Sequence, residues 1–422
     1  MTVQKLVIVG EKQLKGETSV SGGKNSSLAI IPAALLADGP CTIENVPDIQ
    51  DIHVFETILR SLGAEVSYQP AERLMVIDPR TVSSCTVSYD LARQLRASYY
   101  FMGALLGRLG EANVPLPGGC DIGARPIDQH RKAFTALGTQ VSDTGGALAL
   151  KGNPVGTRIN FDLVTVGGTI NAMLAAVRAR GNTVLSNAAR EPHVVDVANF
   201  LNSIGARVRG AGTDTIRIEG RGHLRGGCYT VIPDQIETGT LMIAAAATRG
   251  DVVIRDTIPT HMEALTAKLL EMGVKVTTDD DVIRVQFGDI HRNLQISTQE
   301  YPGFPTALQQ PISALLTRAK GTSVVTENIF SNRFKHLQEM ERMGALVRIS
   351  GNVATIEGVT QLRGAQVSAS DLRCGAALVI AGLMARGTTE VDHVEYIDRG
   401  YEHLEEKLNA LGADITRTTV EE

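Results

Sequence analysis

The stretch VPLPGGCDIGARP, residues 114–126, places a lone cysteine in a loop rich in glycine and proline. Cys120 follows two glycines, and Arg125 comes five residues later. Glycine lets a backbone approach a ligand closely, and a nearby cation favours the reactive thiolate. A structural cysteine is usually a small buried hydrophobe, for which this loop offers little packing. We therefore interpret Cys120 as a chemically active thiol.

The other cysteines are Cys41, Cys85, Cys228 and Cys374. They lie in or beside apolar segments, which predicts buried structural thiols. They show neither the CxxC spacing of a zinc site nor the density of a disulfide framework. We therefore expect no metal, and we expect a reducing compartment, the cytoplasm.

Several cationic side chains stand at the starts of helix-like segments or in turns: Lys24, Arg96, Arg125, Arg333, Arg373 and Arg399. Lys24 and Arg373 each come just before an apolar helix, whose free N–H groups and macrodipole already favour an anion. Arginine adds bidentate contacts to phosphate or carboxylate. Any one of these residues alone is also explained by an ordinary surface ion pair. As a group they predict a site for a small, multiply charged anion.

Acidic residues mark two further helix starts. They are Asp234 and Glu237 in PDQIETGT, and Glu191 and Asp196 in REPHVVD. Carboxylates near the first turn of a helix commonly cap or brace its N-terminus. We expect that structural role for both pairs.

A repeat of about 70 residues supplies the elements that must position these side chains. An LGA-like helix end followed by a strand recurs at Gly63, Gly138, Gly205, Gly273, Gly344 and Gly412. A second glycine ends another helix in each unit, at Gly39, Gly110, Gly181, Gly250, Gly321 and Gly387. The second set fits left-handed C-caps, a conformation that costs other residues steric strain.

Each unit is predicted to run strand, helix, strand, helix, strand, strand. The first helix is apolar on all sides, as in GAALVIAGLMA, and must be enclosed. The second helix is amphipathic and should lay one face on a sheet. Six such units predict an α/β protein of two domains, each with three units and with inner helices wrapped by sheets.

Composition excludes several classes of function. The net charge of −5 argues against a nucleic-acid or membrane-surface binder. With no tryptophan and 4% aromatic residues, base-stacking platforms are not expected. No apolar run is long enough to span a bilayer, and the N-terminus does not read as a signal peptide.

Motifs along the whole chain resemble those of the enolpyruvyl transferases, and most of all of members that act on UDP-N-acetylglucosamine. The motifs are SGGKNS, LRASYYFMGALLGR, LPGGCDIGARPID, NAAREP, IPDQIETGT, ENIFSNRF and YIDRGYEHLEEKL. The resemblance implies two inside-out α/β domains, each of three βαβαββ-like repeats. Domain I would hold residues 1–23 and 233–422, and domain II residues 24–232 with the Cys120 loop. The active site would lie in the cleft between them.

The resemblance also implies a reaction. The enolpyruvyl group of phosphoenolpyruvate would pass to the 3′-hydroxyl of UDP-N-acetylglucosamine by addition and elimination, releasing phosphate without a cofactor. This is the first committed step of peptidoglycan precursor synthesis. Cys120 would be the general acid that protonates the enol methylene, and its thiol would make the protein a target of fosfomycin.

The same resemblance assigns residues to the two substrates. Lys24, Arg125 and Arg399 would hold phosphoenolpyruvate, with Asn25, Arg333 and Arg373 nearby, and Lys24 and Arg399 would join Cys120 in catalysis. The UDP-sugar would contact Arg96, Arg125, Pro126, Ile127, Asp128, Gln129, Thr165, Val166, Gly167, Ala307 and Ile329.

The sequence departs from the family pattern at three positions. The family's FPTD reads FPTA here, so Ala307 stands where an aspartate would face the sugar hydroxyl as base and anchor. Gln235 replaces the arginine of PDRIE, and His193 replaces the second acid of REPE. Loss of a base that also positions the nucleophile lowers rates by orders of magnitude.

Three explanations of Ala307 are open at this stage. It is an engineered substitution that traps a substrate complex, or it marks a paralog acting on another nucleotide or sugar hydroxyl. In the third explanation the chain is a form that binds the nucleotide sugar without catalysis. Retention of Cys120, Lys24 and Arg399 argues against loss of all catalysis.

Overall fold

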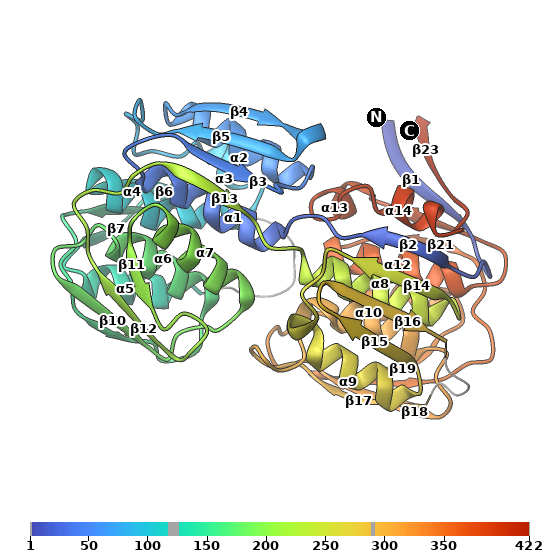
Figure 1. The fold of residues 1–422 in the computed structure, drawn as a ribbon. Helices are drawn as coiled ribbons and strands as arrows, with labels where there is room; N and C mark the ends of the chain where they lie inside the picture. Colours follow the sequence, from blue (N-terminus) through green and yellow to red (C-terminus); the bar gives the residue numbers. More distant parts are fainter. Residues whose placement is uncertain (1, 117–125, 288–291, 422) are drawn as a thin grey trace. The chain divides into compact units, whose positions relative to one another are not determined.

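The computed structural model describes residues 2–116, 126–287 and 292–421, and they form two compact units (Figure 1). Unit 1 holds residues 2–21 and 233–421, and unit 2 holds residues 22–116 and 126–232. The chain passes from one unit to the other at 21/22 and again at 232/233. The boundaries expected from the sequence were 23/24 and 232/233.

Unit 2 consists of three repeats of the predicted order. The first comprises β13 (Gly227–Thr230), α1 (Lys24–Ala33), η1 (Ala34–Leu36), β3 (Cys41–Glu44), α2 (Gln50–Ser61), β4 (Glu65–Gln69), η2 (Pro70–Glu72) and β5 (Leu74–Asp78). The second comprises α3 (Tyr89–Ala92), η3 (Arg96–Tyr99), α4 (Tyr100–Leu109), β6 (Glu111–Pro115), α5 (Asp128–Ala136), β7 (Gln140–Thr144) and β8 (Ala147–Lys151). The third comprises β9 (Arg158–Asn160), α6 (Val166–Ala176), β10 (Asn182–Ser186), α7 (Pro192–Ser203), β11 (Arg207–Arg209) and β12 (Thr215–Glu219).

Unit 1 repeats the same order three times. The first repeat comprises β2 (Lys15–Ser19), α8 (Gln235–Ala247), β14 (Asp251–Arg255), η4 (Pro259–Met262), α9 (Glu263–Met272), β15 (Lys275–Asp279) and β16 (Val282–Gln286). The second comprises β17 (Gln295–Ser297), α10 (Thr306–Leu316), β18 (Thr322–Thr326), α11 (Lys335–Arg342), β19 (Leu346–Ser350) and β20 (Val353–Glu357). The third comprises β21 (Gln366–Ser368), α12 (Leu372–Met384), β22 (Thr388–Asp392), α13 (Glu395–Asp398), α14 (Leu404–Ala410), β23 (Ile415–Glu421) and β1 (Thr2–Val9).

Each repeat folds into its own sheet, and every four-stranded sheet has one parallel pair at its edge. In unit 1 the strand orders are β15-β16-β14-β2, β17-β18-β20-β19 and β21-β22-β1-β23. In unit 2 they are β13-β3-β5-β4, β11-β12-β10-β9 and β6-β8-β7. The three-stranded sheet keeps a trace of its missing edge strand, a single parallel bridge between Thr86 and Asn113.

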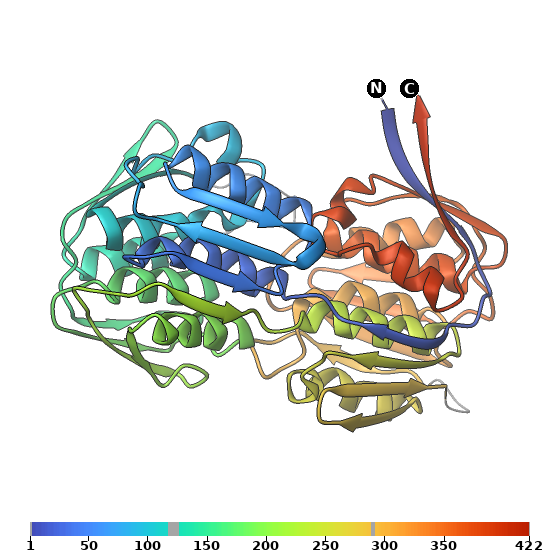
Figure 2. The same cartoon turned by 45° about the horizontal axis from the view of Figure 1, so that its top comes forward.

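The inner helices lie between the sheets, as Figures 1 and 2 show for each unit. Ten of the eleven residues of α6 are buried, and so are twelve of the thirteen residues of α12. In unit 1 the helices α8, α10 and α12 contact one another. A helix without a polar face gains stability only when it is enclosed, so the predicted inside-out arrangement is confirmed.

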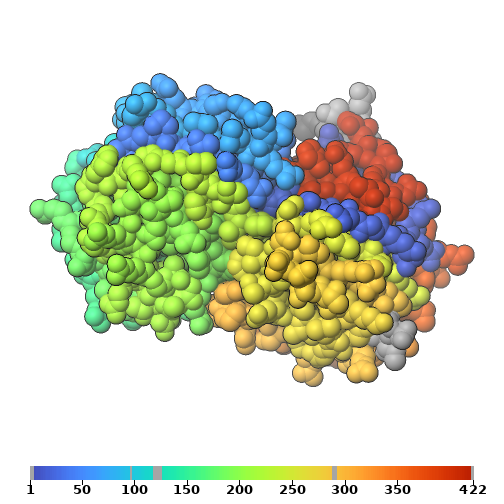
Figure 3. Space-filling model, viewed as in Figure 1, coloured from blue at the N-terminus to red at the C-terminus, as the bar shows by residue number. Residues whose placement is uncertain are grey.

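Strands β2 and β13 each lie next to a point where the chain crosses between the units, and each is an edge strand of its sheet. Strand β2 precedes α1 in sequence but pairs with β14 of unit 1, while β13 precedes α8 but pairs with β3 of unit 2. In the space-filling view the blue segment around β2 runs between the red C-terminal residues and the yellow residues that follow the second crossing (Figure 3). Each unit therefore completes a repeat with a strand from the other end of its sequence.

Glycine conformation follows the repeat with two exceptions. All six LGA-type glycines have positive φ, from 81° at Gly138 to 105° at Gly205. In the second set the predicted left-handed cap is wrong at Gly39 and Gly250. Arg249 takes the left-handed conformation instead (φ 55°), and a Cβ on Gly250 would lie 2.4 Å from the Leu14 carbonyl oxygen. Close backbone approach explains the glycine at that position.

The described residues contain no helix that combines the length and the apolar composition needed to cross a bilayer.

Candidate active site

Lys24 is the first residue of α1, at the edge of unit 2 where the chain enters it. Its ammonium lies 2.7 Å from the Asp51 carboxylate in the first turn of α2. Both side chains are almost fully enclosed, with exposures of 10% and 5%. Asn25, the next residue, is exposed. The predicted cation is therefore held at a helix N-terminus by a buried acid that the sequence reasoning missed.

Three of the segments assigned to the UDP-sugar come together in unit 2. The N-termini of α5 and α6 belong to contacting helices, and η3, which begins at Arg96, reaches both through Tyr99. The centre of the Tyr99 ring lies 5.2 Å from that of the His130 ring. A Cβ on Gly167 would lie 3.2 Å from the Tyr99 ring. Two helix N-termini side by side favour a phosphate-bearing ligand.

Gln129 fixes the start of α5 relative to the segment before α6. It is buried, its Nε2 donates to Asp162 at 3.1 Å, and its Oε1 accepts from the Asp162 N–H at 3.0 Å. Its Nε2 also donates to Asp128 at 2.6 Å. Pro126 and Asp128 are exposed. The structure thus brings the 126–129 segment against the loop that leads to Thr165.

The start of α6 is built for close approach. Thr165 caps the helix by accepting from the Gly168 N–H at 3.2 Å, and Val166 and Gly167 begin the helix. A Cβ at Gly167 would lie 2.9 Å from the His130 ring, so the chain requires glycine there. His130 is buried against Asn171, and this burial lowers its pKa to about 4. A neutral imidazole therefore lies beneath this helix start.

Arg333 and Arg373 lie close together in unit 1, joined through Gln310 of α10. The Gln310 Nε2 donates to the Arg333 carbonyl oxygen and to Asp371, both at 3.4 Å. Asp371 is the N-cap of α12, where it accepts from the N–H of Arg373 at 2.9 Å. The guanidinium of Arg333 stacks over Phe330 at 4.9 Å.

The Arg373 side chain has spare hydrogen-bonding capacity. It is 6% exposed, and its guanidinium lies 5.1 Å from the centre of the Tyr401 ring. Its Nη1 atom is buried and has no hydrogen-bond partner among the described residues. A buried cationic donor without a protein partner indicates a ligand, because leaving it unpaired is costly. Arg399, half-buried at the end of α13, belongs to the same repeat.

Ala307 and Ile329 are linked by a residue that the sequence reasoning missed. Glu327 is 2% exposed, and it accepts from the Thr306 hydroxyl at 2.8 Å and from the Ile329 N–H at 2.9 Å. It also accepts from the Thr298 hydroxyl at 3.0 Å and the Phe330 N–H at 3.1 Å. Ala307 itself is half-buried and packs on the apolar core of unit 1. The Glu327 carboxylate therefore holds the backbone of Ile329 and the side chain next to Ala307, the two residues predicted to contact the UDP-sugar in unit 1.

Hydrogen bonds and burial give structural roles to Asp234, Glu237 and Asp196. Asp234 caps α8, accepting from the N–H of Ile236 at 2.7 Å. Glu237 is buried with Lys407, and burial raises its pKa. Asp196 accepts from the Tyr229 hydroxyl at 2.5 Å, and its pKa is raised by burial. Glu191 occupies the N-cap position of α7, and its carboxylate makes no capping bond there.

The cysteines differ from one another in environment. Cys41 and Cys374 are buried as predicted, and burial raises the pKa of each thiol to about 11. The expectation of burial is wrong for Cys228, which is exposed, and for Cys85, which is half-buried. Cys228 is exposed because side chains alternate between the two faces of β13, and Cys228 lies on the exposed face. Cys120 and Arg125 lie outside the described residues, as does the side chain of Arg96.

No group of three or more His, Cys, Asp or Glu residues is arranged to hold a metal in residues 2–116, 126–287 and 292–421. The site residues fall into two sets. Lys24, Asn25 and the UDP-sugar segments around α5 and α6 belong to unit 2, and Arg333, Arg373, Arg399, Ala307 and Ile329 belong to unit 1.

The chain belongs to the family of EPSP synthase (3-phosphoshikimate 1-carboxyvinyltransferase), the enolpyruvyl transferases, whose family model matches residues 8–408. The resemblance inferred from the motifs is thereby confirmed. Among solved structures, the enolpyruvyl transferase NikO from Streptomyces tendae has a TM-score of 0.90 at 26% identity and covers 100% of both chains. An EPSP synthase from Acinetobacter baumannii has a TM-score of 0.77 at 19% identity, over 99% of this chain and 100% of that one, and shows the shared fold.

Two relatives are much more similar in sequence. UDP-N-acetylglucosamine 1-carboxyvinyltransferase 3 of Caldanaerobacter subterraneus subsp. tengcongensis is 54% identical over 416 residues, 98% of this chain and 99% of the relative. UDP-N-acetylglucosamine 1-carboxyvinyltransferase 2 of Bacillus subtilis is 51% identical over 417 residues, 98% of this chain and 97% of the relative.

Proposed function

We propose that this protein transfers the enolpyruvyl group of phosphoenolpyruvate to the 3′-hydroxyl of UDP-N-acetylglucosamine and releases phosphate. The observation that carries the proposal is the identity of 54% over 98% of the chain to a relative named for this reaction. Both substrates are small molecules, and the protein would act in the cytoplasm, in peptidoglycan precursor synthesis. The reaction uses no metal and no organic cofactor.

The reaction balances without a further reactant. The sugar oxygen bonds to C2 of phosphoenolpyruvate as the methylene carbon gains a proton, which gives a tetrahedral ketal. The bond from C2 to the phosphate oxygen then breaks, the methyl group loses a proton and the double bond returns. The protein must therefore supply an acid for the methylene, a base for the hydroxyl and cations for the departing phosphate.

The cationic residues are assigned to phosphoenolpyruvate. The buried donor of Arg373 and the enclosed ammonium of Lys24 offer charge to phosphate and carboxylate at low solvent exposure, where such contacts are strong. Asn25, Arg333 and Arg399 complete the set, with Arg125. Cys120 is proposed as the acid that protonates the methylene.

The nucleotide sugar is assigned to the helix starts of unit 2. The paired N-termini of α5 and α6 present N–H groups suited to a diphosphate, and glycine at 167 lets the start of α6 lie close to the His130 ring. Arg96, Pro126, Ile127, Asp128, Gln129, Thr165, Val166 and Gly167 are the proposed contacts. Ile329, held by Glu327, would line the sugar pocket with Ala307.

Ala307 favours a second candidate function. Its methyl group packs on the unit 1 core and provides no base where the family pattern has aspartate. An enolpyruvyl transferase that acts on a different nucleotide or sugar hydroxyl would not need the aspartate base at this position. The second candidate is therefore transfer of the same group from phosphoenolpyruvate to another acceptor.

Product analysis separates the two functions. The protein is incubated with phosphoenolpyruvate and, in parallel, with UDP-N-acetylglucosamine, UDP-N-acetylgalactosamine or UDP-glucose, and nucleotides are analysed by mass spectrometry. We expect an enolpyruvyl product with UDP-N-acetylglucosamine, in equal amount to phosphate, and none with a Cys120→Ala variant. Product formation with a different sugar only would establish the second candidate and overturn the first.

A further inference from the structure

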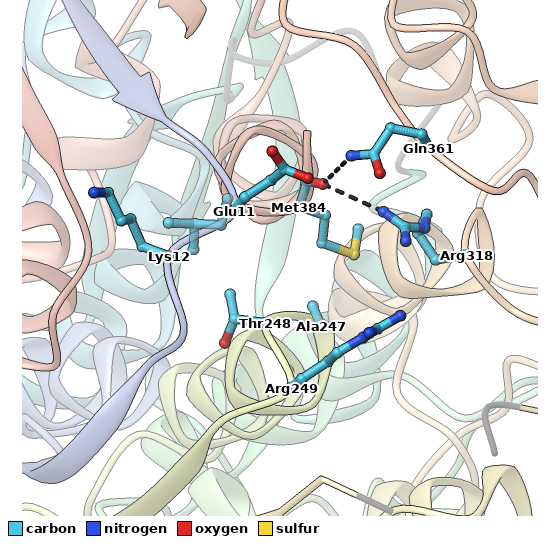
Figure 4. A pocket seen from close by; sticks show the side chains of 9 residues that line it. Glu11, Lys12, Ala247, Thr248, Arg249, Arg318, Gln361 and Met384 are labelled. Carbon is cyan, nitrogen blue, oxygen red and sulfur yellow. Dashed lines mark hydrogen bonds between the residues drawn. The ribbon is translucent and has the colours of Figure 1, made fainter. Parts of the chain in front are cut away.

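A pocket of about 310 Å³ lies in unit 1 at the C-terminal ends of its inner helices (Figure 4). Thr248 and Arg249 follow α8, Arg318 follows α10, and Met384 ends α12. The wall is completed by the turn after β1, which carries Glu11 and Lys12, and by Gln361. None of these residues was assigned to the proposed reaction.

The lining carries an excess of positive charge. Lys12, Arg249 and Arg318 are cationic and Glu11 is the acid of the set. Among the described residues, none of the four side chains lies within ion-pair distance of an opposite charge. Arg249 instead stacks over Phe287 at 5.4 Å. The pocket therefore has two guanidinium groups that form no ion pair with any described residue.

Arg318 is the cation set most deeply into this wall. Its Nη1 donates to the Met384 carbonyl oxygen at 3.4 Å, and Gln361 donates to the same oxygen at 3.4 Å. This is the one hydrogen bond that the Arg318 side chain makes with the described residues. A guanidinium has five N–H donors, so most of those of Arg318 are left for a ligand or water. Burial and the nearby Arg249 lower the pKa of Arg318, and Glu11 raises it.

At the equivalent place in unit 2, an arginine has a carboxylate partner. Arg178 follows α6 as Arg318 follows α10, and its Nε donates to the Leu36 carbonyl oxygen at 3.1 Å. Its Nη2 also lies 2.6 Å from the carboxylate of Asp38. In unit 2 the guanidinium is thus paired with a carboxylate that the protein itself supplies.

Unit 1 lacks that carboxylate because Arg386 stands in its place. The Asp38 N–H donates to the Leu224 carbonyl oxygen at 2.6 Å, and the Arg386 N–H makes the matching bond to Leu362 at 2.9 Å. The two residues are therefore equivalent by backbone pairing. Replacement of Asp by Arg removes the counter-ion of Arg318 and adds another cation to this end of the unit.

A second replacement makes room in the pocket. In unit 2 Arg108 reaches from the end of α4 to the carbonyl oxygens of Leu35 and Ala37, at 2.8 and 2.7 Å. The residue two before the helix-ending glycine is Arg108 in α4 and Thr248 after α8. Thr248 is much shorter and folds back onto its own helix, donating to the Ala244 carbonyl oxygen at 2.9 Å.

We propose that this pocket binds a small multivalent oxyanion, a molecule bearing phosphate or clustered carboxylate groups. Its oxygens pair with Arg318, where the Asp38 carboxylate pairs with Arg178 in unit 2, and with Arg249. The competing explanation is that these cations only offset the negative ends of the three helices. That explanation predicts no anion binding at this place.

Calorimetric titration of the full protein with inorganic pyrophosphate, and separately with citrate, tests the proposal. Variants Arg249→Gln and Arg318→Gln are compared with Arg348→Gln, which removes an exposed arginine of β19 in the same unit. Because charge-assisted hydrogen bonds are lost, each pocket variant should bind the anion about tenfold more weakly or worse. Arg348→Gln should bind as the natural protein does, and Arg318→Lys should keep most of the affinity. Tighter binding of pyrophosphate or of citrate assigns the ligand to the phosphate or the carboxylate class.

Two results would overturn the proposal. One is equal affinity in the natural protein, Arg249→Gln and Arg348→Gln, since Arg249 is exposed and its removal leaves the fold intact. The other is binding that survives both pocket substitutions but disappears in Arg399→Gln, which would assign the anion to the proposed phosphoenolpyruvate site. Failure of the proposed reaction would leave the calorimetric result unchanged.

Discussion

The ammonium of Lys24 and the carboxylate of Asp51 form an ion pair of 2.7 Å that is almost completely enclosed in unit 2. The pair joins the first residue of α1 to the first turn of α2. A carboxylate so placed fixes the position of the ammonium while leaving its other N–H donors available for an anion. Asp51 is thus a positioning residue for the proposed phosphoenolpyruvate site.

Asp51→Asn should destabilise unit 2 by about 3–5 kcal/mol, because it leaves the Lys24 charge buried without its counter-ion. Urea unfolding measures the loss. Glu219→Gln is the control, since its partner Arg207 is exposed and such pairs contribute about 0–1 kcal/mol. The double variant Lys24→Met with Asp51→Leu should regain stability but not activity. Equal urea midpoints for Asp51→Asn and Glu219→Gln would contradict the role assigned to the pair.

Glu327→Leu should impair the acceptor step while leaving the donor step intact. The substitution removes the acceptor for two hydroxyls and two backbone N–H groups around Ala307 and Ile329. Losing such buried partners costs about 1–3 kcal/mol, which should raise the KM for the UDP-sugar roughly 10- to 100-fold. Glu327→Gln keeps a polar group and should recover most of the affinity.

The donor step is measured separately, as modification of Cys120 by phosphoenolpyruvate in mass spectra. Glu357→Gln, at an exposed position of the same sheet, serves as control. If Glu327→Leu weakened the donor and acceptor steps equally, Glu327 would be a general structural residue.

His336→Leu should reduce the acid sensitivity of the fold. His336 is fully buried in unit 1, and burial lowers its pKa from 6.5 to about 3, with Arg333 lowering it further and Asp371 opposing. The unfolded chain therefore binds more protons than the folded one below pH 6.5. The stability contributed by neutral His336 is complete above pH 6.5 and is lost progressively down to pH 3.

Chemical denaturation at a series of pH values measures this effect. Between pH 6 and pH 4 the natural protein should lose about 1.4 kcal/mol per pH unit more than His336→Leu. His393→Gln, at an exposed histidine, should keep the natural slope. An unchanged slope in His336→Leu would show that this residue is not the buried proton acceptor.

The repeat and the fold were predictable because they rest on local rules. The LGA-type glycines mark helix ends that need positive φ. A helix that is apolar on all sides predicts its own burial. Gly39 and Gly250 escaped prediction because their constraint comes from neighbours distant in sequence, such as Leu14 beside Gly250. A local pattern does not report close backbone approach across a fold.

The site was predictable only in part for a similar reason. Lys24, Arg333 and Arg373 stand out because cations at helix starts are unusual in sequence. Asp51 and Glu327 do not, since a carboxylate inside an ordinary helix or after a strand looks like any surface acid. Their roles depend on partners 27 residues away, as for Lys24 and Asp51, or on hydrogen bonds to Thr298 and Thr306.

We propose transfer of enolpyruvate to UDP-N-acetylglucosamine by a chain with Ala307 where the family has an aspartate at the acceptor. The rate of phosphate release from phosphoenolpyruvate with this sugar is measured for this chain and for Ala307→Asp. A positioned base accelerates proton transfer by about 10²–10⁴-fold, so the variant should be at least about 100 times faster. Both proteins should form the enolpyruvyl sugar. If neither did, while phosphoenolpyruvate still modified Cys120, the donor would be right and the acceptor wrong.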